Sequence, residues 1–137
     1  MMKLVYPAKF YYEKEGGYSV EVPDLIGCVT QGETLEEAIE MAQDAALGWL
    51  LTAIEEEEEI PKPSTIEEIK IEKEGFKSLL LLNIDEYTEK YGSKKSIKKT
   101  LTIPQWLNKR AEKLGINFSQ ALQEILLSKI VKMGQKK

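Results

Sequence analysis

Histidine is absent from the 137-residue sequence, and cysteine occurs once, as Cys28. Without histidine, the chain lacks the commonest general base near neutral pH and the commonest zinc ligand, which excludes catalysis by Ser-His or Cys-His pairs. A single cysteine allows no disulfide within the chain. Cys28 follows Gly27 in a short predicted strand, and with no base beside it we expect a buried thiol rather than a nucleophile.

Long apolar segments are also missing. The longest apolar run, residues 79–82, is far shorter than the ~18 residues that a membrane-spanning helix needs. The first residues of the chain lack the apolar core and the small-residue cleavage site of a signal peptide. We therefore expect a cytoplasmic protein, and no residue pattern predicts a cofactor or a metal site.

Basic residues are scarce in the first part of the chain, and acidic residues are scarce in the last part. Residues 1–92 carry 8 Lys and 21 Asp or Glu, a net charge of −13, whereas residues 93–137 carry 11 Lys or Arg and 2 Glu, a net charge of +9. Together these values give the net charge of −4. The asymmetry predicts a basic domain that meets nucleic acid and an acidic domain that meets another partner or faces solvent.

The acidic part predicts an α+β domain with the element order βββαβ. Aromatic and β-branched residues are frequent in 3–12, and Gly16-Gly17 forms a turn before a second strand over 18–22, which indicates a β-hairpin. Glycines bracket a third strand over 28–31. A capping box at Thr34 and Glu37 begins a long amphipathic helix.

This helix is predicted to end in the glutamate run 55–59, because Pro61 and Pro63 follow. The run fits either a solvated helix end or an electrostatic attraction for a basic partner. Ser64 and Glu67 have the spacing of a cap for a short helical turn. A continuous apolar run predicts a last strand over 78–84, buried on both faces.

Three segments are expected on these grounds. The first is a domain over 1–85, the second a connection over 86–93, and the third a basic domain over 94–137. Residues 85–92 fit either a brief helix or a linker.

The basic domain has the pattern of one strand followed by two helices, βαα. In 96–103 a period of two places apolar residues on one face and Lys98, Thr100 and Thr102 on the other. Pro104 begins the first helix, Gly115 ends it, and Asn117 caps the second.

A strand with two short helices cannot bury its apolar faces alone, so two copies are expected to associate. Their strands would pair into an antiparallel ribbon, which fits the major groove of B-form DNA, with Lys98, Thr100 and Thr102 facing the bases. The four helices would share one dimer core, made of Leu101, Ile103, Trp106, Leu107, Ile125 and Leu126.

The segments 99–104 and 115–119 resemble the ribbon-helix-helix repressors. This resemblance implies that the outward strand residues contact base edges, and that the N-terminus of the second helix holds a DNA phosphate. The backbone N–H groups of Asn117, Phe118 and Ser119 would hold it, with Lys94 and Lys95 as further phosphate contacts. Residues 94–99 also fit a solvated linker, and Thr100 and Thr102 also fit ordinary strand residues. Because threonine discriminates bases weakly, we expect Lys98 and DNA shape to provide most of the selectivity.

Three spaced motifs resemble the HicB antitoxin family: Tyr6-Pro7-Ala8-Lys9-Phe10, the stretch 17–28 from Gly-Tyr-Ser-Val to Ile-Gly-Cys, and Gly32-Glu33-Thr34-Leu35-Glu36-Glu37-Ala38. The resemblance implies a partial ribonuclease H-like fold that binds HicA, a small toxin that cleaves mRNA through a histidine. It further implies a type II antitoxin that neutralises this toxin and represses its own operon as a DNA-bound homodimer or a higher oligomer.

Residues that could contact such a toxin are Tyr11, Tyr12, Tyr18, Glu21 and Asp24, although the tyrosines also fit packing on the sheet. The acidic domain would cover the basic toxin and compete with RNA. Asp24 also fits a local role, because a carboxylate after Pro23 can accept backbone N–H bonds in the turn.

Two other functions remain open. One is a ribbon-helix-helix transcription regulator whose first domain senses a protein or a ligand. The other is a magnesium-dependent nuclease, which would need several carboxylates that converge from different elements. The candidates Glu21, Asp24, Asp44 and Asp85 show no such convergence in their spacing, so we do not expect an enzyme.

Overall fold

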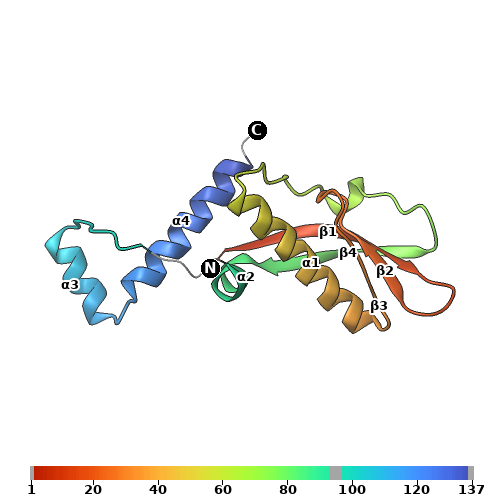
Figure 1. The fold of residues 1–137 in the computed structure, drawn as a ribbon, viewed down its shortest axis with the longest axis horizontal. Helices are drawn as coiled ribbons and strands as arrows, with labels where there is room; N and C mark the ends of the chain where they lie inside the picture. The colour runs from red at the N-terminus through yellow and green to blue at the C-terminus, as the bar shows by residue number, and fades with distance from the viewer. Residues whose placement is uncertain (1, 93–96, 136–137) are drawn as a thin grey trace.

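The computed structural model describes residues 2–92 and 97–135. Its elements are the strands β1 (Lys3–Tyr12), β2 (Tyr18–Glu21), β3 (Val29–Gly32) and β4 (Gly75–Asn83), the helices α1 (Leu35–Glu55), α2 (Ile84–Tyr91), α3 (Gln105–Lys113) and α4 (Phe118–Gly134), and a 3-10 turn η1 (Ile66–Glu68) (Figure 1). The predicted order βββαβ is present. None of these helices is both long enough and apolar enough to cross a bilayer, within the described residues.

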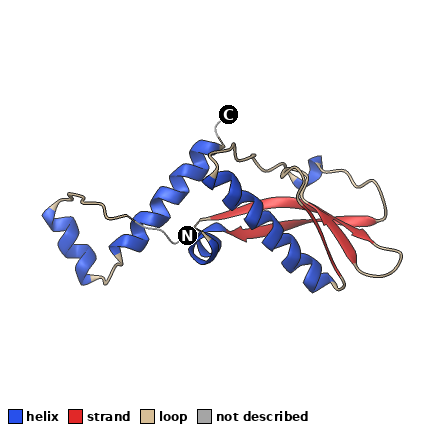
Figure 2. Cartoon of the chain, in the orientation of Figure 1, coloured by secondary structure: helices blue, strands red, loops and turns tan. Residues whose placement is uncertain are grey.

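The four strands form one antiparallel sheet in the order β3-β2-β1-β4, and α1 lies across one face of it (Figure 2). β1 is central and pairs with β4 along nine residue pairs, including Tyr6 with Leu80. The hydrophobic core lies between the sheet and α1, where Tyr6, Leu50 and Leu80 are at most 2% exposed. Burying one such leucine side chain contributes about 1.5–3 kcal/mol.

Small side chains allow α1 to approach the sheet closely. Ala38, Ala42 and Ala46 recur every fourth residue on the buried side of the helix and are fully buried. At Gly32, a Cβ atom would lie 2.4 Å from the backbone nitrogen of Ala38, so the end of β3 touches the first turn of α1. Thr34 is confirmed as the N-cap, because its Oγ1 accepts the N–H of Glu37 at 3.1 Å. The reciprocal bond of the predicted capping box differs, because the Glu37 carboxylate accepts the N–H of Glu33 rather than that of Thr34.

The prediction of a last strand buried on both faces is wrong. β4 is an edge strand in which Leu80 and Leu82 are buried, whereas Leu79 and Leu81 are 52% and 53% exposed. The physical reason is that α1 covers only one face of the sheet, so alternate side chains of β4 point away from the core.

Smaller corrections concern the flanking segments. β3 begins one residue later than predicted, at Val29, and includes Gly32. The short turn is capped by Thr65 and Glu68 rather than by Ser64 and Glu67. The segment that fitted either a helix or a linker forms α2, which the side chain of Asn83 caps.

In the basic part, both predicted helices are present. Asn117 caps α4 by accepting the N–H of Gln120 at 3.0 Å, and Gly115, with φ +69°, follows α3. The strand predicted over 96–103 is absent from the described part, because residues 97–104 have no regular secondary structure. A strand needs a partner for its backbone groups, and the expected partner is a second copy of the chain.

The C-terminal end of α4 packs into the core of the sheet domain. Val131 is fully buried in the same hydrophobic cluster as Tyr6 and Leu50. The backbone N–H of Ile60 donates to the carbonyl of Gly134 at 3.3 Å. The predicted division into domains over 1–85 and 94–137 does not include this packing of α4 against the sheet domain.

Candidate protein and nucleic-acid interfaces

The residues expected to face DNA lie in the irregular segment before α3. Lys98, Thr100 and Thr102 are all exposed there, so they are available for contact, but the single chain does not hold them in a strand. Lys94 and Lys95 lie outside the described residues. Asn117, Phe118 and Ser119 begin α4, as predicted, and their position gives a helix N-terminus that favours an anion.

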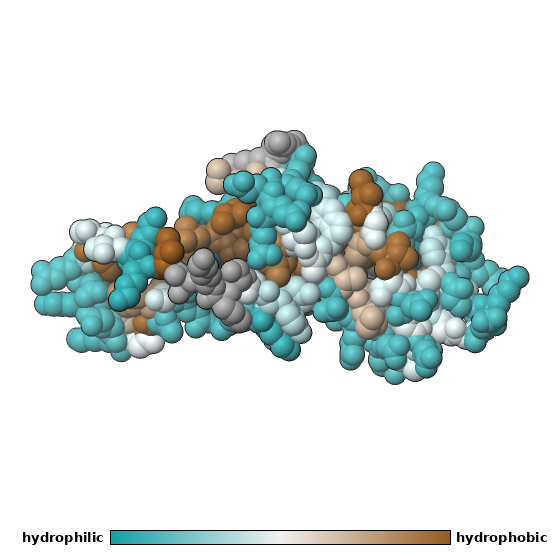
Figure 3. All heavy atoms as spheres, in the orientation of Figure 1, coloured by the Kyte–Doolittle hydropathy of each residue, from teal (hydrophilic) through white to brown (hydrophobic). Residues whose placement is uncertain are grey.

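The expected dimer core is exposed in the single chain. The exposed fraction of Trp106 is 67%, and those of the other five residues, Leu101, Ile103, Leu107, Ile125 and Leu126, are 42–57%. Figure 3 shows apolar side chains at the surface of this part of the molecule. A monomeric soluble protein rarely leaves so many large apolar side chains together in water, which indicates a surface that another protein chain covers.

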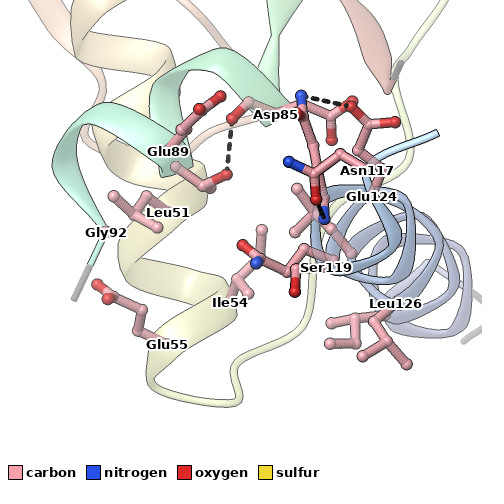
Figure 4. Close-up of a pocket in the computed structure, with 15 residues that line it drawn as sticks. Leu51, Ile54, Glu55, Asp85, Glu89, Gly92, Asn117, Ser119, Glu124 and Leu126 are labelled. Atoms are coloured by element: carbon pink, nitrogen blue, oxygen red, sulfur yellow. Dashed lines mark hydrogen bonds between the residues drawn. The ribbon is translucent and has the colours of Figure 1, made fainter. Parts of the chain in front are cut away.

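A groove separates α4 from the sheet domain (Figure 4). Asn117, Ser119 and Glu124 of α4 line one side, and α1 and α2 line the other side with, among others, Glu55 and Glu89. The negative charges of these carboxylates would repel a phosphate bound on this side of α4. A DNA phosphate at the N-terminus of α4 would therefore have to approach from the side away from the groove.

The three tyrosines that could contact a toxin differ in their surroundings. Tyr11 is buried, and the Lys73 ammonium lies 5.3 Å from its ring centroid. Tyr12 is 56% exposed and Tyr18 is half-buried, and their ring centroids lie 5.7 Å apart. Both rings also contact Phe76 of β4. The structure thus brings Tyr12 and Tyr18 together at the end of the sheet and places Tyr11 against the segment before β4.

The acidic candidates also have partners within the chain. Asp24 accepts two hydrogen bonds from Ser64, from its backbone N–H at 2.8 Å and from its hydroxyl at 2.6 Å. These bonds fix the loop after α1. The sequence suggested bonds within the turn after Pro23, but the carboxylate accepts both of these bonds from Ser64. Glu21 ends β2 and is half-buried beside Lys9 of β1.

A second hollow, which sequence reasoning did not predict, lies beside the turn between β2 and β3. Ile26, Val29, Trp49 and Glu58 are among the residues that line it. Ile26 is 87% exposed, the largest exposed fraction among the large apolar side chains of the described residues. The available signal was the apolar pair Leu25-Ile26 in a turn bounded by Pro23 and Gly27, where only one of two adjacent side chains can be buried.

Two features would indicate a catalytic site in the described part of the chain, a cluster of metal-binding side chains and a reactive thiol. Across residues 2–92 and 97–135, no three or more Cys, Asp or Glu side chains group in a way that could hold a metal ion. Burial raises the pKa of the Cys28 thiol, which disfavours the reactive thiolate.

The sequence is similar to known antitoxins. A family model described as "HicB_like antitoxin of bacterial toxin-antitoxin system" matches residues 6–129. "Antitoxin HicB 1" of Photorhabdus laumondii is 43% identical over 61 residues, which cover 44% of this chain and 39% of that protein. The chain thus spans less than half of the length of the first curated relatives that it matches, 39% and 48%.

Solved structures are similar over most of the chain. One chain of a toxin-antitoxin complex from Streptococcus pneumoniae is 32% identical with a TM-score of 0.60, and the match covers 93% of this chain and 99% of that one. The antitoxin HicB of Burkholderia pseudomallei is 24% identical with a TM-score of 0.57, over 93% and 97% of the two chains, and supports the fold alone.

Proposed function

Because this chain belongs to the HicB-like antitoxin family of bacterial toxin-antitoxin systems, we propose that it neutralises a HicA-type toxin and represses its own operon. The family consists of regulatory antitoxins rather than enzymes. In this proposal the sheet domain, a partial ribonuclease H-like fold, binds the mRNA-cleaving toxin in the cytoplasm. The basic C-terminal part binds operator DNA as a ribbon-helix-helix dimer.

The family match over residues 6–129 is the observation that carries toxin binding. The charge of the domain supports it, because a net charge of −13 over residues 1–92 attracts a protein that must itself be basic to bind RNA. A covered toxin cannot reach RNA, so neutralisation requires no chemistry from the antitoxin.

Operator binding is supported by the exposed apolar side chains of α3 and α4 in a segment of net charge +9. Association of two copies would cover those side chains. It would also let the two segments 97–103 pair as a ribbon and would place two copies of Lys98, Thr100 and Thr102 on the side that faces the major groove. Outside this dimer the segment has no pairing partner.

The experiment that tests toxin binding is co-purification with the product of the adjacent reading frame, its catalytic histidine replaced by alanine to prevent cell killing. We expect a stable complex, and relief of growth arrest when the active toxin is produced together with this chain. An adjacent gene product that neither binds nor kills would contradict the assignment.

Operator binding is tested separately by a gel shift with the DNA upstream of the gene, against a scrambled fragment of equal length. We expect the upstream fragment to bind at least about 1,000-fold more tightly, the lower end of the usual range for specific over non-specific DNA binding. Equal affinity for both fragments would remove the repressor role and leave the toxin-binding role unaffected.

A further inference from the structure

The negative charge of the sheet domain is confined to one continuous stretch. Residues 15–61 contain 13 Asp or Glu and no Lys or Arg, whereas the rest of residues 1–92 contains 8 acidic and 8 basic residues. This stretch forms β2, β3 and α1. The acidic surface therefore lies on these three elements, and β4 at the other edge of the sheet carries no part of the excess.

Within this acidic stretch, one turn presents an apolar side chain to solvent. Leu25 is fully buried and anchors the turn, while the adjacent Ile26 is 87% exposed. The N–H of Leu25 donates to the carbonyl of Val22 at 3.0 Å, and Gly27 adopts φ +83°, which favours glycine. These contacts fix the backbone on both sides of Ile26.

A contact from α1 fixes the same turn a second time. The indole Nε1 of Trp49 donates to the carbonyl of Ile26 at 3.0 Å. Ile26 is thus held away from the core by a rigid backbone, so its binding conformation costs little ordering entropy when a partner docks. An exposed apolar residue on a mobile loop would have no such advantage.

The hollow beside the turn completes the surface. It is lined by Ile26, by Val29, which is 62% exposed, by Trp49 of α1 and by Glu58 of the glutamate run. An apolar centre with a polar rim is the usual composition of an interface between proteins. Among the described residues, Glu58 is the one charged residue that lines the hollow, and together with the other carboxylates of residues 15–61 it favours a basic partner.

We propose that this hollow, defined by Ile26, Val29, Trp49 and Glu58, is the docking site for the toxin. The toxin would place an apolar side chain against Ile26 and Val29, and its lysines or arginines would face the carboxylates of residues 15–61. This inference rests on the proposed function, because it names the surface that takes the partner assigned there.

The test uses the full chain and, as the probe, the histidine-inactivated product of the adjacent reading frame. Affinity is measured by calorimetry for the wild type and for Ile26→Lys, Ile26→Glu and Leu79→Lys. Leu79 is the matched control, because it is also an exposed apolar residue and its substitution changes the net charge equally, but it lies on β4 at the opposite edge of the sheet. Thermal unfolding verifies that each variant is folded.

We expect Ile26→Lys to weaken toxin binding by about 30-fold or more, the loss typical of a hot-spot residue. Ile26→Glu should weaken it less, because glutamate keeps the attraction for a basic partner, and Leu79→Lys should stay within about threefold. Amide exchange of the wild type should also slow in residues 24–29 when the toxin binds.

The contrary outcomes are distinct. If the wild type binds but Ile26→Lys behaves like Leu79→Lys and the amides of 24–29 are not protected, the docking site is overturned and the antitoxin function stands. If the wild type does not bind, both proposals fall. If Ile26→Lys instead changes the self-association of the chain, the occupant is a second copy and the inference is wrong.

Discussion

At the scale of the residue, the buried Tyr6 connects two parts of the sheet domain by a hydrogen bond whose loss should lower the free energy of unfolding. Its hydroxyl donates to the carbonyl of Pro61 at 2.5 Å and thereby fixes the chain after α1 to the central strand. Tyr6→Phe keeps the ring and removes this bond, so we expect the free energy of unfolding to fall by about 1 kcal/mol. Urea denaturation at pH 7 measures the change, with Tyr12→Phe as the control because Tyr12 is 56% exposed.

The same residue predicts a loss of stability at alkaline pH. Burial, with the nearby Asp24 carboxylate as a smaller cause, raises the pKa of Tyr6 to about 12, above the value near 10 of an unfolded chain. The folded state therefore favours the neutral phenol. Its contribution is complete below about pH 10 and disappears as the pH rises toward 12. Tyr6→Phe should unfold with a shallower alkaline decline than the wild type, and identical declines would contradict this assignment.

Lys98 gives the residue-scale prediction for operator binding. In the proposed ribbon it faces DNA, so Lys98→Ala should weaken binding and reduce the salt dependence, by about 0.9 in the logarithmic slope for each phosphate that is no longer neutralised. Lys109→Ala removes the same charge from α3 and serves as the control. A salt-titrated gel shift in which both variants behave alike would show that general charge, and not the ribbon face, determines affinity.

At the scale of the element, α4 joins the two parts of the molecule. Val131 is fully buried against the sheet domain, whereas Met133, two residues later, is 69% exposed. We expect Val131→Ala to lower the free energy of unfolding by about 2 kcal/mol, since it removes buried methyl groups. Met133→Ala on the same helix should change it by less than about 0.5 kcal/mol. Equal small effects in urea denaturation would show that α4 is not docked in solution.

Local patterns were sufficient to predict most elements. The hairpin turn, the Thr34 cap, the prolines after α1 and the Asn117 cap each fix a boundary through neighbouring residues, so these boundaries follow from the sequence. The exposure of Leu79 and Leu81 could not be predicted in this way. It depends on which strand pairs with β4 and on how many faces the helices cover, and both are properties of the whole sheet.

The candidate sites also divide into those that local sequence predicts and those that depend on long-range contacts. Period two and the change in charge predict the DNA-facing residues from local sequence, and that prediction stays untested in a single chain. Asp24 was expected to bond within its own turn but binds Ser64, 40 residues away. The apolar pair Leu25-Ile26 indicates that one of the two side chains is exposed, but the hydrogen bond that Trp49 donates to the Ile26 carbonyl is a long-range contact with no local signature.

At the scale of the whole molecule, charge and apolar surface separate the two binding functions. The acidic stretch 15–61 lies on β2, β3 and α1. In the basic segment beyond residue 92, α3 and the N-terminal part of α4 extend away from the sheet (Figure 1). A toxin on the first surface and DNA on the second would not compete for the same residues. Because α4 is docked on the sheet domain through Val131, a bound toxin would nevertheless constrain where the DNA-binding segments can lie.

Dimerisation through the C-terminal part can be followed by tryptophan fluorescence, because one tryptophan lies in that part. The chain has two tryptophans: Trp49 in α1, and Trp106 in α3, which is 67% exposed in the single chain. In the proposed dimer Trp106 is buried in the shared core, so its fluorescence should shift to shorter wavelength as the protein concentration rises. Trp49→Phe isolates this signal, and Trp106→Phe, which retains only Trp49, should show no such shift.

Sedimentation equilibrium on the same samples gives the dissociation constant, which should coincide with the midpoint of the fluorescence change. The unfolding temperature of α3 and α4 should rise with concentration, because association stabilises the folded state by mass action. Leu107→Asp places a charge in the shared core and should abolish all three effects, while toxin binding by the sheet domain persists. A Leu107→Asp chain that still forms dimers would require an interface other than the one made by α3 and α4.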